Sequence, residues 1–270
     1  GLKDLGVVAF YQSDYERARR YYEWSLEIAM EHDARRIEAD CLNNLGGIAW
    51  KQGAHDRARE YLERALPISR DLGDKQAEFS ILNNLGEIAQ AQDAYDRARE
   101  YYEASLAIFR DLGHRRGEAA TLNNLGLVAE RQSAYDQARE YFEGSLAIKR
   151  ELGDRQGEAR SLDNLGEITR YQGEYERARE YVERSLAISR DLGDRQGEAT
   201  SLDTLGMVAY RQGDADEAAE HLQRSLDIAR DIGVRSIEAT SLADLATVAL
   251  RRGEYGRARE YLDRGLETFE

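Results

Sequence analysis

Hydrophobic residues recur along the chain at spacings of three and four, with polar and charged residues between them. Such spacings place side chains on one face of an α-helix, so each stripe predicts an amphipathic helix that is buried along one side. Glycine just past a helix end adopts the left-handed conformation without a Cβ penalty, so Gly153, Gly173 and Gly193 are predicted helix ends. Residues 155–191 therefore predict two helices joined by a short turn. The two stripes in this segment are Ala159, Leu162, Leu165, Gly166 and Ile168, then Tyr175, Ala178, Tyr181, Val182, Ser185, Leu186 and Ile188.

This helical pattern repeats every 40 residues without an insertion. A Leu-Gly pair marks the first helix of the first six copies, from Leu5-Gly6 to Leu205-Gly206, and the seventh copy has Leu245-Ala246 there. An alanine twelve residues later marks the second helix of each copy. A fixed period of this length is typical of arrays in which each copy buries its apolar face against its neighbours. We therefore predict an all-α fold, a single array of seven antiparallel helical hairpins over residues 1–270. The expected copies are 1–31 (a truncated first unit), 32–71, 72–111, 112–151, 152–191, 192–231 and 232–270.

The recurring glycine inside the first helix needs a structural reason, because glycine there costs about 1 kcal/mol relative to alanine. A missing side chain lets the partner helix of the hairpin approach closely. We expect a large side chain of the second helix to pack over each of these glycines.

The composition limits the classes of function. A formal net charge of −14 argues against nucleic acid as a partner, because phosphate binding needs a basic face. The apolar runs are only a few residues long, so we expect no membrane association. The single Cys41 excludes an internal disulfide and fits a cytoplasmic protein. The four histidines lie at four different repeat positions without metal-ligand spacing, and no catalytic motif appears, so we expect no cofactor, no metal and no enzymatic activity.

The residues that mark each copy resemble the tetratricopeptide repeat. One copy reads Leu42-x2-Leu45-Gly46-x2-Ala49 and then Ala58-x3-Leu62, beside the family pattern W-x2-L-G-x2-Y and A-x3-F. Leucine replaces the tryptophan, alanine replaces the tyrosine, and the period is 40 and not 34, which predicts longer helices. HEAT repeats share the longer period but not the spacing of Leu-Gly and alanine.

The longer repeat is similar to those of kinesin light chains and Pins-type adaptors, and to sensor arrays of bacterial and archaeal signalling ATPases and transcription regulators. The phrase Gly-Asp-Arg-Gln-Gly-Glu-Ala, at 153–159 and 193–199, is typical of the sensor arrays. The resemblance implies a right-handed superhelical solenoid whose concave groove is lined by the first helix of each hairpin. It also implies that the residues just before Leu-Gly point into this groove.

Pairs of asparagines occupy those groove positions in several copies. Asparagine is a mediocre helix former, so its repeated presence in mid-helix needs a reason. One hypothesis is a ladder of amides that grips the backbone of an extended peptide. The alternative is that one asparagine per copy bonds between neighbouring repeats. The candidates are Asn44, Asn84, Asn124 and Asn164, and, with less support, Asn43, Asn83 and Asn123.

Further candidates lie one or two turns later on the same helices, where the copies differ from one another. Variation at these positions fits both a tailored binding surface and an unconstrained solvated one. Trp50 and Tyr210 are the predicted anchors, because aromatic side chains dominate the energetics of interfaces. Glu87, Arg131 and Arg170 add charges of both signs.

These features favour a protein- or peptide-binding scaffold, the partner-docking or sensor region of a larger regulatory protein. Two alternatives stay open, a solenoid that senses a small molecule for a signalling ATPase or transcription regulator, and a purely structural repeat array. The first copy begins partway through its first helix, and the last ends without a polar cap. We therefore expect a segment of a longer protein whose open apolar ends self-associate end to end.

Overall fold

The computed structural model describes residues 1–268, and all secondary-structure elements in this range are α-helices. This confirms the predicted all-α class. Residues 269 and 270, the last two of the predicted copy 232–270, lie outside the described residues. The helices are α1 (Leu2–Tyr11), α2 (Tyr15–Glu31), α3 (Arg35–Lys51), α4 (His55–Asp71), α5 (Lys75–Ala91), α6 (Tyr95–Asp111), α7 (Arg115–Arg131), α8 (Tyr135–Glu151), α9 (Arg155–Tyr171), α10 (Tyr175–Leu192), α11 (Arg195–Gln212), α12 (Ala215–Asp231), α13 (Arg235–Arg251) and α14 (Tyr255–Glu267).

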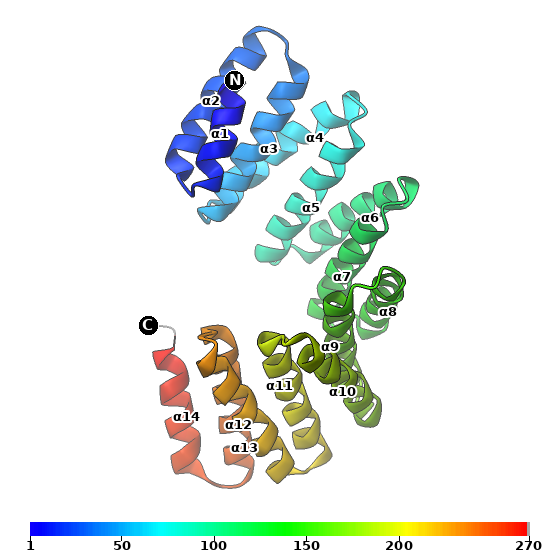
Figure 1. The fold of residues 1–270 in the computed structure, drawn as a ribbon, viewed down its shortest axis with the longest axis vertical. Coiled ribbons are helices and arrows are strands. Elements are labelled where there is room, and N and C mark those ends of the chain that lie inside the picture. The colour runs from blue at the N-terminus through cyan, green and yellow to red at the C-terminus, as the bar shows by residue number, and fades with distance from the viewer. Residues whose placement is uncertain (269–270) are drawn as a thin grey trace. The chain divides into compact units, whose positions relative to one another are not determined.

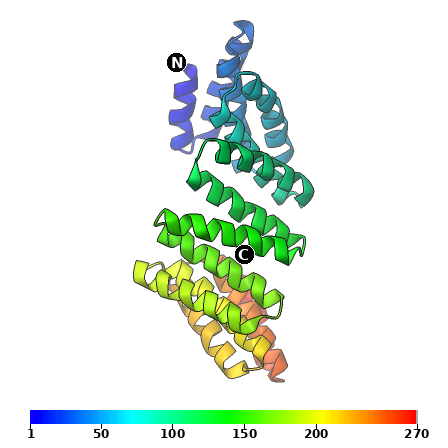
Figure 2. The same cartoon turned by 90° about the vertical axis from the view of Figure 1, so that its right-hand side faces the viewer.

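The helices group into two compact units. Unit 1 covers Gly1–Gln132 and contains α1 to α7, and unit 2 begins at Ser133 and contains α8 to α14. Within each unit, successive helices lie side by side and run antiparallel (Figures 1 and 2). Helices two apart also touch, as α3 does with α5 and α9 with α11. The odd-numbered helices, called the first helices below, therefore form one row within each unit.

A glycine on a first helix lets the second helix of the hairpin approach closely, as predicted. A Cβ built on Gly86 of α5 would lie 2.5 Å from Cε1 of Tyr102 on α6. In unit 2, a Cβ on Gly206 of α11 would lie 2.6 Å from Cγ of Leu222 on α12. Tyr102 and Leu222 are both buried, so these contacts belong to the core.

Glycines and polar caps set the ends of the helices. Gly153 and Gly173 have φ angles of 67° and 81°, the left-handed conformation predicted for them. The carboxylate of Asp154 then accepts a hydrogen bond from the backbone N–H of Gly157 at 2.9 Å and caps α9. At the start of α7, His114 fills the same role, because its Nδ1 accepts from the N–H of Gly117 at 3.0 Å.

Candidate functional site

The asparagine pairs lie in mid-helix on the first helices, and all seven of the predicted side chains are half-buried. Asn43 and Asn44 lie on α3, Asn83 and Asn84 on α5, Asn123 and Asn124 on α7, and Asn164 lies on α9.

Between α3 and α5 the amides bond between neighbouring repeats. Nδ2 of Asn84 on α5 donates to Oδ1 of Asn43 on α3 at 3.4 Å. The equivalent bond one repeat later is not formed, because Oδ1 of Asn83 is buried without a hydrogen-bond partner among the described residues. The side chains of Asn44 and Asn124 make no hydrogen bond to the described residues either. Bonding between repeats therefore accounts for only part of the asparagine pattern.

On α9 and α11 of unit 2, aspartate replaces the first asparagine of the pair, and this position faces the junction between helices. Asp163 of α9 is buried, and it accepts hydrogen bonds from the hydroxyls of Ser185 on α10 and Ser201 on α11, both at 2.8 Å. Asp203 of α11 likewise accepts from Ser241 of α13 at 2.7 Å. Both carboxylates link successive repeats, so the first position of the pair has a packing role in unit 2.

Burial changes the protonation of these carboxylates. Burial raises the pKa of Asp163 to about 7, although the hydrogen bonds from Ser185 and Ser201 oppose the rise. Burial also raises the pKa of Asp203, and the neighbouring carboxylate of Asp244 raises it further.

A hollow on unit 1 gathers three of the predicted site residues. Its volume is about 510 Å³, and Trp50 from α3, Glu87 from α5 and Arg131 from α7 all line it. Residues of the α5–α6 turn region complete the wall. The other lining residues are Gln90, Ala91, Asp93 and Tyr95.

Two charged groups of this hollow are unpaired. Arg131 is exposed and forms no ion pair with the described residues, and the same is true of Glu87. Surrounding atoms bury the carboxyl of Glu87, which raises its pKa, although the positive charge of Lys51 opposes the rise. The side chain nevertheless keeps a solvent-exposed surface. The hollow therefore offers one free cation and one free acidic group to a ligand.

The aromatic and amide groups of the hollow are held in place by neighbours. The Trp50 ring packs against the His55 ring with 4.7 Å between centroids. The hydroxyl of Tyr95 donates to Asp93 Oδ1 at 2.6 Å, and the buried hydroxyl of Tyr102 donates to Gln90 Oε1 at 3.4 Å.

The structure does not place Arg170 and Tyr210, the two predicted site residues further along unit 2, in this hollow. Arg170 of α9 is buried, its guanidinium donates to the carboxylate of Glu167, and its Cζ lies 4.4 Å from the ring centroid of Tyr171. The ring of Tyr210 on α11 lies under the guanidinium of Arg251, at 4.8 Å. Both predicted contacts are therefore already engaged within unit 2.

Residues 1–268 hold no cluster of three or more metal-ligating side chains, and none of the described helices is long and apolar enough to cross a membrane. Cys41 is fully buried, and burial raises the pKa of its thiol, so this residue is a core position of unit 1.

The sequence profile of the tetratricopeptide repeat matches residues 2–71, 77–151, 117–191, 157–231 and 197–270. These ranges take in nearly all of the chain, so the chain belongs to the tetratricopeptide repeat family. A comparison with curated proteins gives no match.

Solved structures share this fold at low sequence identity. The apo form of RapI has a TM-score of 0.81 and 16% identity, over 99% of this chain and 96% of RapI. A signal transduction ATPase with numerous domains and a tetratricopeptide repeat sensor, from Pyrococcus horikoshii, has a TM-score of 0.79 and 16% identity, over 99% of this chain and 41% of that protein. The Rap conjugation gene regulator of plasmid pLS20, in complex with the Phr* peptide, has a TM-score of 0.63 and 15% identity, over 99% of this chain and 72% of the regulator.

Proposed function

We propose that this chain is a non-catalytic binding scaffold that holds a peptide segment of a partner protein against the first helices of unit 1. The observation that carries the proposal is the hollow that joins Trp50, Glu87 and Arg131 from three successive first helices. These positions vary between copies, whereas the packing positions around them repeat. Variation at positions that line a hollow is what a tailored binding surface requires.

The chemistry of the hollow indicates the class of peptide. Trp50 offers an aromatic surface for an apolar or aromatic side chain, the kind of anchor that dominates interface energetics. Arg131 suits an acidic side chain and Glu87 a basic one, since neither is paired with a described residue. Asn44, Asn84 and Asn124 lie on the same helices and supply amide groups for the peptide backbone. Asn164, Arg170 and Tyr210 remain proposed contacts in unit 2.

The fold relatives support a binding role. The plasmid pLS20 regulator was solved with a peptide, and the Pyrococcus horikoshii protein carries its repeats as a sensor. By analogy with the sensor, we propose that this scaffold serves a regulatory protein.

Selection from a library of randomised peptides displayed on phage tests the proposal. We expect the wild-type chain to enrich peptides that carry an aromatic or large apolar residue flanked by charges. Trp50→Ala should weaken the binding of the enriched peptides at least tenfold. Leu250 occupies the same repeat position in unit 2 and is exposed, so Leu250→Ala is the control for this position and should leave binding unchanged. Enriched peptides that bind the Trp50→Ala variant as well as the wild type would exclude the hollow as their site.

A small-molecule sensor is the second candidate, because a volume of about 510 Å³ also lies within the range of metabolite pockets. A thermal-shift screen against a metabolite panel distinguishes the two. A saturable shift that Arg131→Ala abolishes, together with a failed peptide selection, would favour the sensor.

We also propose that copies of the chain associate end to end. Leu262 and Leu266 of α14 are 48% and 69% exposed, whereas Leu222 and Leu226, their equivalents one repeat earlier, are fully buried. On α1, Leu5 and Val8 are similarly uncovered. Sedimentation over a hundredfold range of concentration should show association that Leu266→Glu abolishes and Tyr255→Glu, an exposed control on the same helix, retains. A mass that stays monomeric throughout would exclude this association.

A further inference from the structure

Tyr95 lines the hollow of unit 1 and is the first residue of α6. In three other hairpins, the residue at this repeat position packs against a second aromatic ring. The Tyr15 ring on α2 lies 5.6 Å from the Phe10 ring on α1, measured between centroids. The His55 ring on α4 lies 4.7 Å from the Trp50 ring on α3. A ring at the start of a second helix is therefore regularly covered by another ring.

The third of these contacts lies one repeat after Tyr95, inside unit 2. Tyr135 of α8 and Tyr171 of α9 stack nearly parallel, with 5.4 Å between centroids and 13° between planes. Stacked aromatic pairs at this separation are stabilised beyond the area that they bury. Tyr171 is 45% exposed, so its ring stands at the surface and not in the core. A ring from another molecule can therefore reach an equivalent place.

Around Tyr95, the positions of those partner rings hold residues without a ring. Gln90 takes the place that Trp50 has in the preceding hairpin. Arg131, which takes the place that Tyr171 has in the following hairpin, is exposed. The half-buried Tyr95 ring therefore borders the hollow at the place where other hairpins have a second ring.

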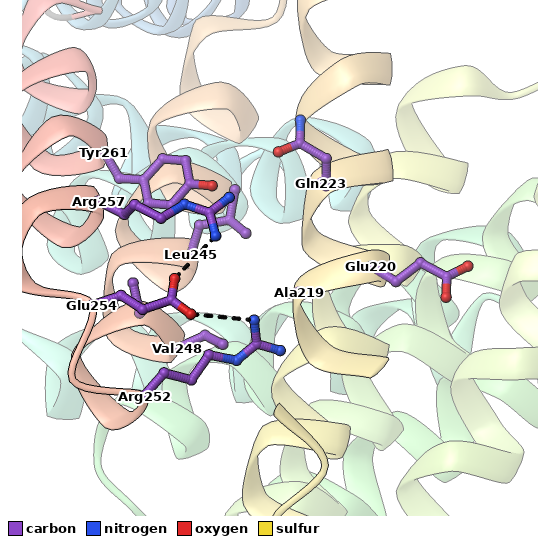
Figure 3. A pocket seen from close by; sticks show the side chains of 10 residues that line it. Ala219, Glu220, Gln223, Leu245, Val248, Arg252, Glu254, Arg257 and Tyr261 are labelled. Atoms are coloured by element: carbon purple, nitrogen blue, oxygen red, sulfur yellow. Dashed lines mark hydrogen bonds and ion pairs between the residues drawn. The ribbon is translucent and has the colours of Figure 1, made fainter. Parts of the chain in front are cut away.

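Arginine is the other aromatic partner in this chain, but its contacts follow a different spacing. In three second helices an arginine covers the tyrosine four residues later, as Arg57 covers Tyr61 at 5.6 Å. In a smaller hollow of unit 2, of about 240 Å³, Arg257 likewise lies beside Tyr261 (Figure 3). The residue four before Tyr95 is an alanine, so Tyr95 has no such arginine.

Arg131 stands near Tyr95 from the neighbouring first helix. The hydrogen bond to Asp93 raises the pKa of the Tyr95 hydroxyl, and the positive charge of Arg131 opposes the rise. A charge that acts on this hydroxyl also repels a second guanidinium beside the ring. A neutral ring of a bound peptide meets no such repulsion.

We propose that the hollow of unit 1 selects an aromatic side chain of the bound peptide, whose ring stacks on Tyr95 as Tyr171 stacks on Tyr135. This inference rests on the proposed function and adds Tyr95 as the residue that determines the preference for a ring. Trp50 lines the same hollow from α3 and offers apolar surface to the remainder of the side chain. The volume of about 510 Å³ accommodates a side chain of this size.

NMR titration of the full chain, labelled in its tyrosine rings, tests this preference with four capped peptides. Their sequence is acetyl-Lys-Ser-X-Ser-Glu-amide, with phenylalanine, tyrosine, arginine or cyclohexylalanine at X. Cyclohexylalanine is close to phenylalanine in size but has no π system. We expect the phenylalanine and tyrosine peptides to shift the ring signals of Tyr95 upfield, and to bind about threefold to tenfold more tightly than the other two.

Variants separate the ring of Tyr95 from the remainder of the hollow. Tyr95→Leu should abolish the preference for phenylalanine over cyclohexylalanine, and Tyr95→Phe should keep it, because the ring remains. Arg131→Tyr should weaken binding of the phenylalanine peptide at least fivefold, because the new ring copies Tyr171 and covers Tyr95. Tyr175→Leu, at the same repeat position in unit 2, is the matched control and should change neither affinity nor preference.

Equal affinities for phenylalanine and cyclohexylalanine, an arginine peptide that binds as tightly as either aromatic one, or a preference that survives Tyr95→Leu would overturn the inference. If Trp50→Ala still removed the binding in those cases, the peptide site of the proposed function would stand without Tyr95. No binding by any of the four peptides would also overturn the inference, and the phage selection then decides the proposed function separately.

Discussion

The hydroxyl of Ser201 on α11 donates to Oδ1 of Asp163 on α9 at 2.8 Å, inside the core of unit 2. The equivalent position is asparagine in the three preceding copies, so Asp163 places a titratable group where those copies hold a neutral amide. This contact makes the stability of unit 2 dependent on pH.

The free energy of unfolding should rise on acidification because of Asp163. Burial raises the pKa of this carboxyl in the folded chain to about 7, against 3.8 for an ordinary aspartate. The folded state therefore keeps the proton between pH 4 and 7 while the unfolded state loses it, so stability falls as pH rises through this window. Between pH 5 and pH 8, the free energy of unfolding measured with urea should fall by about 2 kcal/mol more in the wild type than in Asp163→Asn. Equal losses in the two proteins would mean that Asp163 is ionised in the folded core.

Overpacking at Gly86 should destabilise unit 1. A methyl group there would meet the buried ring of Tyr102 at 2.5 Å, which outweighs the gain in helix propensity, so Gly86→Ala should lower the free energy of unfolding by about 1 kcal/mol or more. Gly47 is the matched control, because it lies in the same kind of helix and a Cβ there meets nothing within 4 Å. Gly47→Ala should raise the free energy of unfolding by up to about 1 kcal/mol. Similar effects at both positions, measured by chemical unfolding, would contradict the close approach of α5 and α6.

The two asparagines of a pair should behave differently. Asn43 accepts a long hydrogen bond from Asn84, so Asn43→Ala should cost about 0.5–1 kcal/mol of stability. Asn44→Ala should leave stability unchanged or slightly raised, because its side chain makes no hydrogen bond to the described residues. If Asn44 holds a peptide backbone, Asn44→Ala should still weaken the binding of the selected peptides severalfold. Loss of stability without loss of binding at Asn44 would remove it from the proposed site.

The hairpins could be predicted from the sequence because they depend on local periodicity. The Leu-Gly pairs, the left-handed glycines and the caps at Asp154 and Asp194 all follow from spacing within one copy. The histidines lack metal-ligand spacing, and one of them, His114, caps α7. An imidazole nitrogen accepts a hydrogen bond as aspartate does, and the fixed register at the start of each first helix could have indicated this role.

The candidate site was only partly predictable. Trp50, Glu87 and Arg131 came from repeat positions that vary, and they meet in one hollow. Asp93 and Tyr95 were missed because they belong to a turn and a second helix, which the repeat pattern does not relate to the face of the first helices. Arg170 was treated as a free charge, although its spacing of three from Glu167 predicts an ion pair. The burial of Asp163 depends on three helices at once, which periodicity alone does not describe.

Photo-crosslinking from the hollow of unit 1 shows directly whether a peptide binds there. Ala91 is exposed and lines the hollow, so a benzoylphenylalanine at position 91 would lie beside a bound peptide. Arg211 is the exposed equivalent in unit 2 and provides the control. We expect a selected peptide to crosslink from position 91 and not from position 211, and Trp50→Ala to reduce the product at least fivefold. Crosslinks from position 211 alone, or a product from position 91 that Trp50→Ala leaves unchanged, would show that the peptide does not bind in this hollow.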